Sequence, residues 1–154
     1  MKVIDKFTGD YDFLSNFYYA VVYLDGMACP TNEHAYQAAK TLDPILRKQI
    51  ISTTTPGIAK RLGRKLDKQG LTRPDWKEIN LALMGNLVTQ KFAYPELKEK
   101  LLATEDAILI EGNNWCDNFW GDCVCESCLY VKGKNHLGLI SMKVRGMLRE
   151  TNVS

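Results

Sequence analysis

Prolines mark the points at which most of the helices expected in this chain begin. Pro44, Pro56 and Pro95 can each occupy the first turn of a helix, where the missing backbone N–H would have no helical partner in any case. Pro74 lies within Thr72–Asp75, which resembles the capping box that opens many helices. The chain is therefore predicted to form a series of separate helices.

Capping residues and apolar spacing give these helices their expected limits. Thr55 is a good N-cap residue for the helix at Pro56, and Gly70 follows its expected end. Apolar residues spaced three and four apart predict a buried stripe on each longer helix. The expected helices cover residues 31–42, 44–50, 56–68, 74–92, 95–103 and 137–149.

Strand-forming residues are fewer and lie mostly near the start of the chain. Tyr18–Leu24 has strong strand composition, Asp25-Gly26 is a favoured two-residue hairpin turn, and Met27–Cys29 would begin the return strand. Val3–Phe7 and Ala107–Glu111 are the other expected strands. The fold class is therefore expected to be α+β, a mostly helical single domain with a small antiparallel sheet.

Composition limits the class of protein without naming a function. The chain has 154 residues, enough for one domain with a real core, which we expect to span residues 1–150 with a tail at 151–154. A net charge of +2 does not by itself indicate a nucleic-acid partner. The sequence has no apolar run near the ~20 residues of a membrane span and no signal-like N-terminus, so we expect a cytoplasmic protein without a membrane partner.

One predicted helix carries a polar face that could hold a ligand. Glu33, Gln37 and Lys40 align along one side of the segment from Pro30 to Lys40, spread over roughly 10 Å at about 1.5 Å per residue. A carboxylate, an amide and an amine facing one space suit the binding and cleavage of a sugar-sized molecule. An ordinary exposed face with scattered charges is the alternative.

Basic residues collect on the helix predicted at 56–68. Arg61 and Arg64 offer planar sets of donors that suit a phosphate, and Lys60, Lys65 and Lys68 add to the charge. A plain solvated helix face would have the same composition. The helix is thus a candidate phosphate site with that alternative left open.

Two polar, aromatic segments look too specific to be simple connections. Phe13–Phe17 contains Asn16, which could bind a ligand or cap a turn, and Glu111–Gly121 combines two acids with two tryptophans, Trp115 and Trp120. A tryptophan beside a carboxylate can stack on a base or sugar while the acid takes part in chemistry. Packing in the core is the alternative for either tryptophan.

Four of the five cysteines fall between Cys116 and Cys128. Cys123, Cys125 and Cys128 form a C-x-C-x-x-C cluster, and either Cys116 or His136 could complete four zinc ligands. The spacing does not match the paired C-x-x-C units of a common zinc ribbon. Reduced thiols in a surface segment are the alternative, and no metal and no cofactor are assigned.

Taken in order, these segments resemble the NADAR family, also known as the YbiA-like N-glycosidases. The resemblance extends from the first strand nearly to the C-terminus, and each motif is weak alone whereas their order and spacing are specific. The matching segments are Phe13–Phe17, Pro30–Lys40, Ala59–Arg64, Arg73–Trp76, Lys91-Phe92, Leu109–Glu111, Asp117–Gly121 and Asn135–Gly138. The cysteine segment occurs in only part of the family, so no role for it is carried over.

The resemblance implies the NADAR fold and hydrolysis of the bond between a ribose C1′ and a nitrogen. Some members act on riboflavin-pathway intermediates and release ribose 5-phosphate from a pyrimidine, and others remove ADP-ribose from guanine in nucleic acid. The site residues that the resemblance implies are Glu33, Lys40, Trp76, Glu111, Asp117, Trp120 and Asn16, of which we assign Glu33, Lys40, Glu111 and Asp117 to catalysis and the others to substrate binding. The chemistry of their side chains adds Arg61 or Arg64 as the group that would hold the phosphate. The chain departs from the family pattern at Ile140-Ser141-Met142, where relatives usually have two apolar residues before the methionine. This difference affects packing and not the site.

Two routes for the reaction stay open at this point. In one, Glu33 or Asp117 activates water while another acid protonates the departing nitrogen. In the other, which we favour, Lys40 attacks C1′ and forms an imine with the opened ribose, with Glu33 or Glu111 moving protons. Lys40 could instead be a static cation that pairs with a phosphate or with Glu33.

Three functions are therefore considered. The first is an N-glycosidase acting on a small phosphoribosylated substrate, and the second is the same enzyme acting on ADP-ribosylated guanine in DNA or RNA. The third is a non-catalytic module that binds ADP-ribose or a nucleotide. Retention of Lys40 and of every acid counts against the third, because a binding module does not need them. The oligomeric state is left open.

Overall fold

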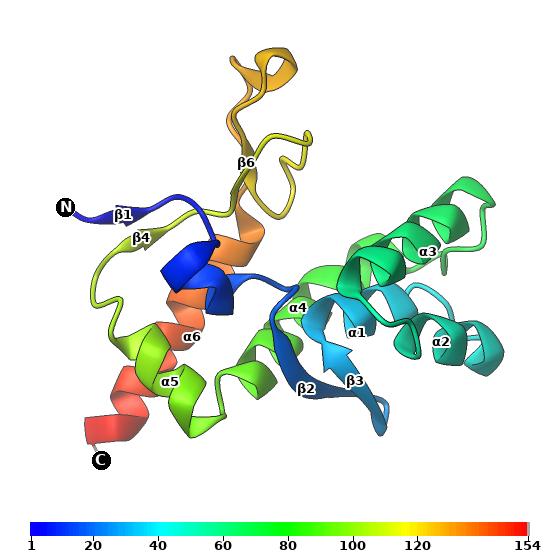
Figure 1. Ribbon diagram of the computed structural model, residues 1–154, viewed down its shortest axis with the longest axis horizontal. Coiled ribbons are helices and arrows are strands. Elements are labelled where there is room, and N and C mark those ends of the chain that lie inside the picture. The colour runs from blue at the N-terminus through cyan, green and yellow to red at the C-terminus, as the bar shows by residue number, and fades with distance from the viewer. Residues whose placement is uncertain (154) are drawn as a thin grey trace. The chain divides into compact units, whose positions relative to one another are not determined.

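The computed structural model describes residues 1–153 and divides the chain into two compact units (Figure 1). The central unit is Asn16–Lys91, and the terminal unit combines Met1–Ser15 with the chain from Phe92 onward. The predicted tail at 151–154 lies within the last helix as far as Val153, and Ser154 is outside the described residues.

A β-hairpin opens the central unit. β2 (Tyr19–Leu24) pairs antiparallel with β3 (Met27–Thr31), and the register places Leu24 opposite Met27. Asp25 and Gly26 have φ values of 47° and 82°, as the favoured hairpin turn requires. The predicted hairpin and its turn are therefore confirmed.

Four helices complete the central unit, and the first of them lies among the others. α1 (Asn32–Ala38) contacts the hairpin and the helices α2 (Pro44–Ile51), α3 (Pro56–Lys68) and α4 (Trp76–Lys91), as Figure 1 shows. All seven of its residues are buried. Its polar side chains are therefore not the solvated helix face that was the alternative.

The helix starts follow the prolines with one exception. Pro44, Pro56 and Pro95 each lie in the first turn of a helix, and the Thr55 hydroxyl caps α3 by accepting from the Ile58 N–H. The predicted helix at Pro74 begins instead at Trp76. The prediction of a capping box at Thr72 is wrong, because the Thr72 hydroxyl donates a hydrogen bond to Asp67 and does not cap α4.

The terminal unit is built from short strands and two helices. β1 (Val3–Ile4) pairs in parallel with β4 (Ile108–Leu109), and η1 (Gly9–Leu14) is a 3₁₀ helix. α5 (Pro95–Leu102) contacts both η1 and α6 (His136–Val153), which in turn packs against β4 (Figure 1). Ser141 of α6 is buried, and its hydroxyl has no hydrogen-bond partner among the described residues.

A second parallel pair organises the segment between β4 and α6. β5 (Gly112–Asn113) pairs with β6 (Asp122–Cys123), and the short 3₁₀ helix η2 (Glu126–Cys128) follows. The predicted loop after Glu111 therefore contains ordered pairing that composition did not indicate. The expected α+β class, mostly helical with a small antiparallel sheet, is confirmed, and the two parallel pairs add to it. None of the helices in the described residues is long and apolar enough to cross a bilayer.

Candidate active site

Glu33 begins a chain of polar contacts at the start of α1. Its side chain is nearly buried, and its backbone N–H donates to the Asn16 carbonyl over 3.1 Å. The Asn16 amide oxygen accepts from the Asn32 amide at 3.5 Å, and Asn16 is itself buried. The structure therefore places the Asn16 backbone beside that of Glu33, and the substrate-binding role of Asn16 stays a prediction.

Gln37 holds the Glu33 carboxylate from one turn further along α1. Its amide nitrogen donates to Glu33 Oε1 over 2.8 Å, which fixes one carboxylate oxygen. The Gln37 amide oxygen is buried and has no hydrogen-bond partner among the described residues. A buried polar atom without a partner is costly, and it is a natural contact for a ligand donor.

Gly63 allows α3 to approach α1 closely at Gln37. A Cβ atom on Gly63 would lie 1.8 Å from the Gln37 amide oxygen and 3.0 Å from its Cβ atom. Only glycine fits at such a distance, because any side chain would displace Gln37. Gly63 therefore contributes to the close packing of α3 against α1 at Gln37.

Lys40 is anchored by an ion pair just beyond the end of α1. Its Nζ lies 2.7 Å from Asp67 Oδ2, and the lysine side chain is 7% exposed whereas that of Asp67 is 45% exposed. Its carbonyl accepts from the Arg73 N–H at 2.7 Å. Lys40 was expected on the helix face, but α1 ends at Ala38 and a following turn carries the lysine.

An aromatic pair lies next to this lysine. The rings of Tyr36 and Trp76 have centroids 4.9 Å apart with an interplanar angle of 55°. The Lys40 Nζ lies 5.9 Å from the centroid of the Tyr36 ring, within range of a cation–π contact. Trp76 stands at the start of α4, where the Arg73 guanidinium donates two hydrogen bonds to the Asp75 carboxylate.

Four of the five basic residues of α3 are exposed, and Lys60 is half-buried. Arg61 and Arg64 are both exposed, and Lys60 lies with its Nζ 5.8 Å from the ring centroid of Phe17. Arg64 precedes Asp67, the partner of Lys40, by three residues and therefore lies on a neighbouring part of the same helix surface. The phosphate site on this helix stays a prediction.

In the terminal unit, Asp117 holds a turn. Its Oδ1 accepts from the backbone N–H groups of Phe119 at 3.1 Å and Trp120 at 2.9 Å. The Asn113 side chain binds the Asp117 backbone on both sides, accepting from its N–H and donating to its carbonyl. Oδ1 of Asp117, the expected catalytic carboxylate, therefore stabilises the turn at Phe119 and Trp120.

Glu111 lies in a tightly packed part of the terminal unit. Its N–H donates to the Asn135 amide oxygen at 3.0 Å, and the Asn135 amide nitrogen donates to the Leu109 carbonyl at 2.9 Å. A Cβ atom on Gly121 would lie 2.1 Å from the Glu111 carbonyl oxygen and 2.7 Å from its Oε2. Asn135 and Gly121 thus fix the position of Glu111.

The two loop tryptophans differ in exposure. Trp120 is 9% exposed, and its ring lies 4.8 Å from Phe119 and 6.3 Å from His136, both edge to face. Trp115 is 52% exposed. Trp120 therefore belongs to an aromatic cluster with Phe119 and His136. Its burial there favours packing over substrate binding as the role of most of the Trp120 ring.

Three residues of these arrangements had no role in the sequence interpretation. Asp67 holds Lys40, Tyr36 packs on Trp76, and Asn135 positions Glu111. Asp67 left a usable signal, because it is the only acid on a helix that carries five basic residues. Tyr36 and Asn135 belonged to motifs of the resemblance, but nothing in their spacing indicated these partners.

Comparisons with known proteins identify the family to which the chain is related. Residues 5–149 match the NADAR domain. The N-glycosidase YbiA of Escherichia coli (strain K12) is 36% identical over 140 residues, which are 90% of this chain and 82% of that protein. The NMR structure of the E. coli protein YbiA matches with a TM-score of 0.83 and 33% identity, over 99% of this chain and 88% of that one.

Longer proteins contain a similar region. The riboflavin biosynthesis protein VVA0006 of Vibrio vulnificus is 36% identical over 142 residues, which are 92% of this chain but 36% of that protein. The chloroplastic riboflavin biosynthesis protein PYRR of Zea mays is 32% identical over 82% of this chain and 21% of that protein. The matches confirm the expected class of enzyme, an N-glycosyl hydrolase. With nearly its whole length matched, the chain belongs to the NADAR family.

Proposed function

We propose that this chain hydrolyses the bond between ribose C1′ and nitrogen in a small phosphoribosylated intermediate of the riboflavin pathway, with release of ribose 5-phosphate. The observation that carries the proposal is the arrangement in the central unit. A buried carboxylate, Glu33, and an anchored amine, Lys40, lie on or just after one short helix, next to the Tyr36–Trp76 aromatic pair. The names of two relatives as riboflavin biosynthesis proteins favour this substrate class.

Glu33 and Lys40 can supply the chemistry that such a bond requires. Cleavage builds positive charge at C1′, and the Glu33 carboxylate, held by Gln37, can stabilise that charge. On the imine route, Lys40 first gives a proton to Asp67, whose Oδ2 is 2.7 Å away. Its Nζ then forms a bond to C1′ as the bond to the base breaks, and the departing nitrogen takes up, through water, the proton that Asp67 received. The C1′–O4′ bond of the ribose then opens as a proton passes from Nζ to O4′, which leaves an imine between Lys40 and the opened sugar.

Water completes the cycle on this route. It adds to the imine carbon of the opened ribose, and the C1′–Nζ bond breaks to return the free amine and ribose 5-phosphate. On the alternative route, Glu33 deprotonates a water molecule that attacks C1′ directly, and Lys40 acts as a cation. Both routes use the same two side chains, and only the imine route forms a covalent adduct.

The aromatic and basic residues would bind the two ends of the substrate. Trp76 would stack on the pyrimidine, and exposed Arg61 or Arg64 would hold the 5-phosphate. Asn16 would bind near Glu33. Catalytic roles for Glu111 and Asp117, and base stacking by Trp120, stay predictions of the family resemblance.

A substrate comparison tests the proposal. The purified protein is incubated in parallel with a phosphoribosylated aminopyrimidine, an ADP-ribosylated guanine oligonucleotide and free ADP-ribose. We expect release of ribose 5-phosphate from the first substrate. If ADP-ribose were released from the oligonucleotide and the aminopyrimidine were left intact, the substrate would be ADP-ribosylated guanine. Tight binding of ADP-ribose without turnover of either substrate would identify a non-catalytic binding module.

Borohydride reduction during turnover distinguishes the two routes. The imine route predicts a reduced sugar adduct on Lys40, detected by peptide mass spectrometry, and none in Lys40→Ala. Lys65→Ala, an exposed lysine on α3, is the matched control and should still form the adduct. An active enzyme that forms no adduct under these conditions would favour the water route.

A further inference from the structure

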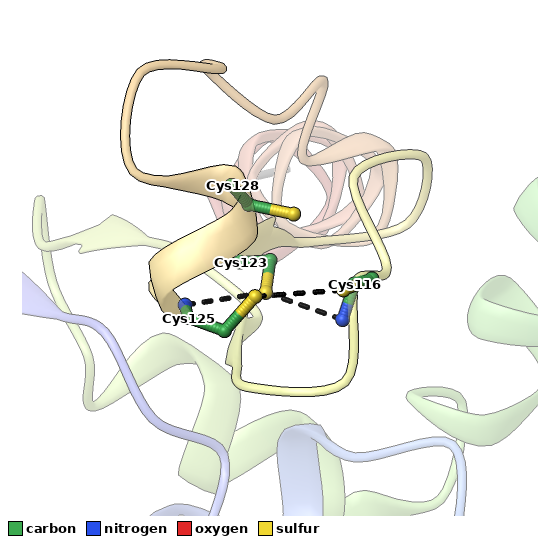
Figure 2. Close-up of side chains that lie close together, drawn as sticks. All are labelled: Cys116, Cys123, Cys125 and Cys128. Carbon is green, nitrogen blue, oxygen red and sulfur yellow. Dashed lines mark hydrogen bonds between the residues drawn. The ribbon is translucent and has the colours of Figure 1, made fainter.

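Four cysteine side chains of the terminal unit, none of which belongs to the candidate active site, meet in one place. The sulfur atoms of Cys116, Cys123, Cys125 and Cys128 all lie within 4.8 Å of one another. Figure 2 shows them converging, with Cys116 in the loop before β6, Cys123 in β6, Cys125 just before η2 and Cys128 at the end of η2. All four are free thiols.

Backbone groups near this cluster point toward the sulfur atoms. The N–H groups of Cys116 and Cys125 both donate to Cys123 Sγ, at 3.2 Å and 3.4 Å (Figure 2). Two N–H donors directed at one sulfur are contacts of the kind that orient metal-bound ligands. The Cys116 and Cys125 sulfur atoms are 3.4 Å apart, well beyond the ~2.05 Å of a disulfide bond.

We propose that Cys116, Cys123, Cys125 and Cys128 bind one structural zinc ion. A tetrahedral zinc site with bonds of about 2.3 Å places its sulfur atoms roughly 3.8 Å apart, close to the spacing in the cluster. Four thiolates are a complete ligand set for zinc and leave no open position for water or substrate. The site would therefore stabilise the fold and would not activate a nucleophile.

The donor set narrows the choice of metal. Soft thiolates favour zinc or iron over magnesium and calcium, which prefer oxygen. His136, the other candidate for the fourth ligand, packs its ring against Phe119 at 4.7 Å, and Cys116 completes the set instead. Binding would displace the remaining thiol protons to solvent and leave the site with two net negative charges.

The cysteine cluster lies at both ends of the Asp117–Gly121 turn, so that a bound metal would stabilise this turn. Cys116 and Cys123 flank Asp117–Gly121, the turn whose backbone N–H groups Asp117 holds. The Asn118 amide oxygen accepts from the Cys123 N–H at 2.9 Å, so the turn is already tied to β6. A metal bound to both flanking cysteines would close this turn and fix Trp120 against Phe119.

Metal analysis of the purified full chain tests the site. We expect one zinc per chain after growth in medium containing zinc and iron, and loss of that zinc in Cys116→Ser and Cys125→Ser. Cys116 is exposed, so its serine variant should fold, which circular dichroism would verify. Cys29→Ser is the matched control and should keep its zinc, since Cys29 is a separate buried cysteine on β3 whose pKa burial raises to about 11.

Cobalt(II) provides a spectroscopic measurement that does not depend on activity. When it is added to the zinc-free chain, we expect the intense visible absorption of tetrahedral thiolate coordination, lost in Cys116→Ser and retained in Cys29→Ser. Zinc should then displace the cobalt. Absence of stoichiometric metal and of the cobalt spectrum, full retention of zinc in both cluster variants, or iron in place of zinc would each overturn the proposal.

Discussion

At the scale of single residues, the central finding is that Lys40 is held from two sides. Asp67 binds its Nζ at 2.7 Å, and the Tyr36 ring lies beneath it. A lysine so constrained differs from an ordinary surface amine, because its position is fixed before substrate arrives. Asp67 is therefore a positioning residue in our account, and on the imine route it also receives the lysine proton.

Replacing Asp67 by asparagine tests this role. We expect kcat to fall by about 10- to 100-fold with little change in KM, since the variant cannot accept the proton. The free energy of unfolding should fall by less than about 1 kcal/mol, because Asp67 is partly exposed and solvent screens the pair. Asp10→Asn, at an exposed position, is the control, and unchanged kcat in Asp67→Asn would contradict the role.

His34 gives the chain a pH-dependent stability. It is fully buried between Thr31 Oγ1 at 2.8 Å and the Thr53 carbonyl at 3.0 Å, and burial lowers its pKa below 6.5. The unfolded chain therefore binds a proton at higher pH than the folded chain does. Its contribution is present above about pH 6.5 and is lost as pH falls through the lowered value.

Urea unfolding at a series of pH values measures this contribution. The free energy of unfolding of the unmodified chain should decrease as the pH falls below about 6.5. In His34→Gln that decrease should be smaller, whatever the absolute stability of the variant. An equally steep decrease in both proteins would show that other groups cause it.

At the scale of elements, the sequence predicted helices and the hairpin well where local chemistry decides them. Thr55-Pro56 starts α3 and Asp25-Gly26 closes the hairpin, because capping and positive φ depend on neighbours in the chain. The early end of α1 and the β5–β6 pairing were missed. Both depend on residues distant in sequence, such as the hydrogen bond from the Arg73 N–H to the Lys40 carbonyl.

The contact between α1 and α3 offers a test at this scale. Gly63→Ala should lower the free energy of unfolding by about 1–3 kcal/mol, because the new methyl group meets the Gln37 side chain. Activity should fall as well, since Gln37 holds the Glu33 carboxylate. The measurements are chemical denaturation and a rate assay.

Gly85→Ala on α4 is the matched control for this prediction. A Cβ atom at Gly85 would meet no other atom within 4 Å, so alanine should be neutral or stabilising by up to about 1 kcal/mol. Equal effects of the two substitutions would show that helix propensity, and not close packing, determines the result at Gly63.

At the scale of the whole molecule, family membership could be inferred from the order of motifs, and the match over residues 5–149 bears it out. Asn16, Glu33, Lys40 and Trp76 were all named from the sequence, and the structure places them in the central unit. Their partners could not be named in this way. Asp67 lies 27 residues beyond Lys40, and only the folding of α3 against α1 brings them together.

The function that we propose for this chain is cleavage of a ribosyl carbon–nitrogen bond by side chains on and just after α1. The most direct measurement is the rate of ribose 5-phosphate release from a phosphoribosylated aminopyrimidine by the unmodified chain, Glu33→Gln and Lys40→Ala. We predict steady release by the unmodified chain and a loss of at least about 100-fold in each variant. Release by either variant at the rate of the unmodified chain would contradict the account.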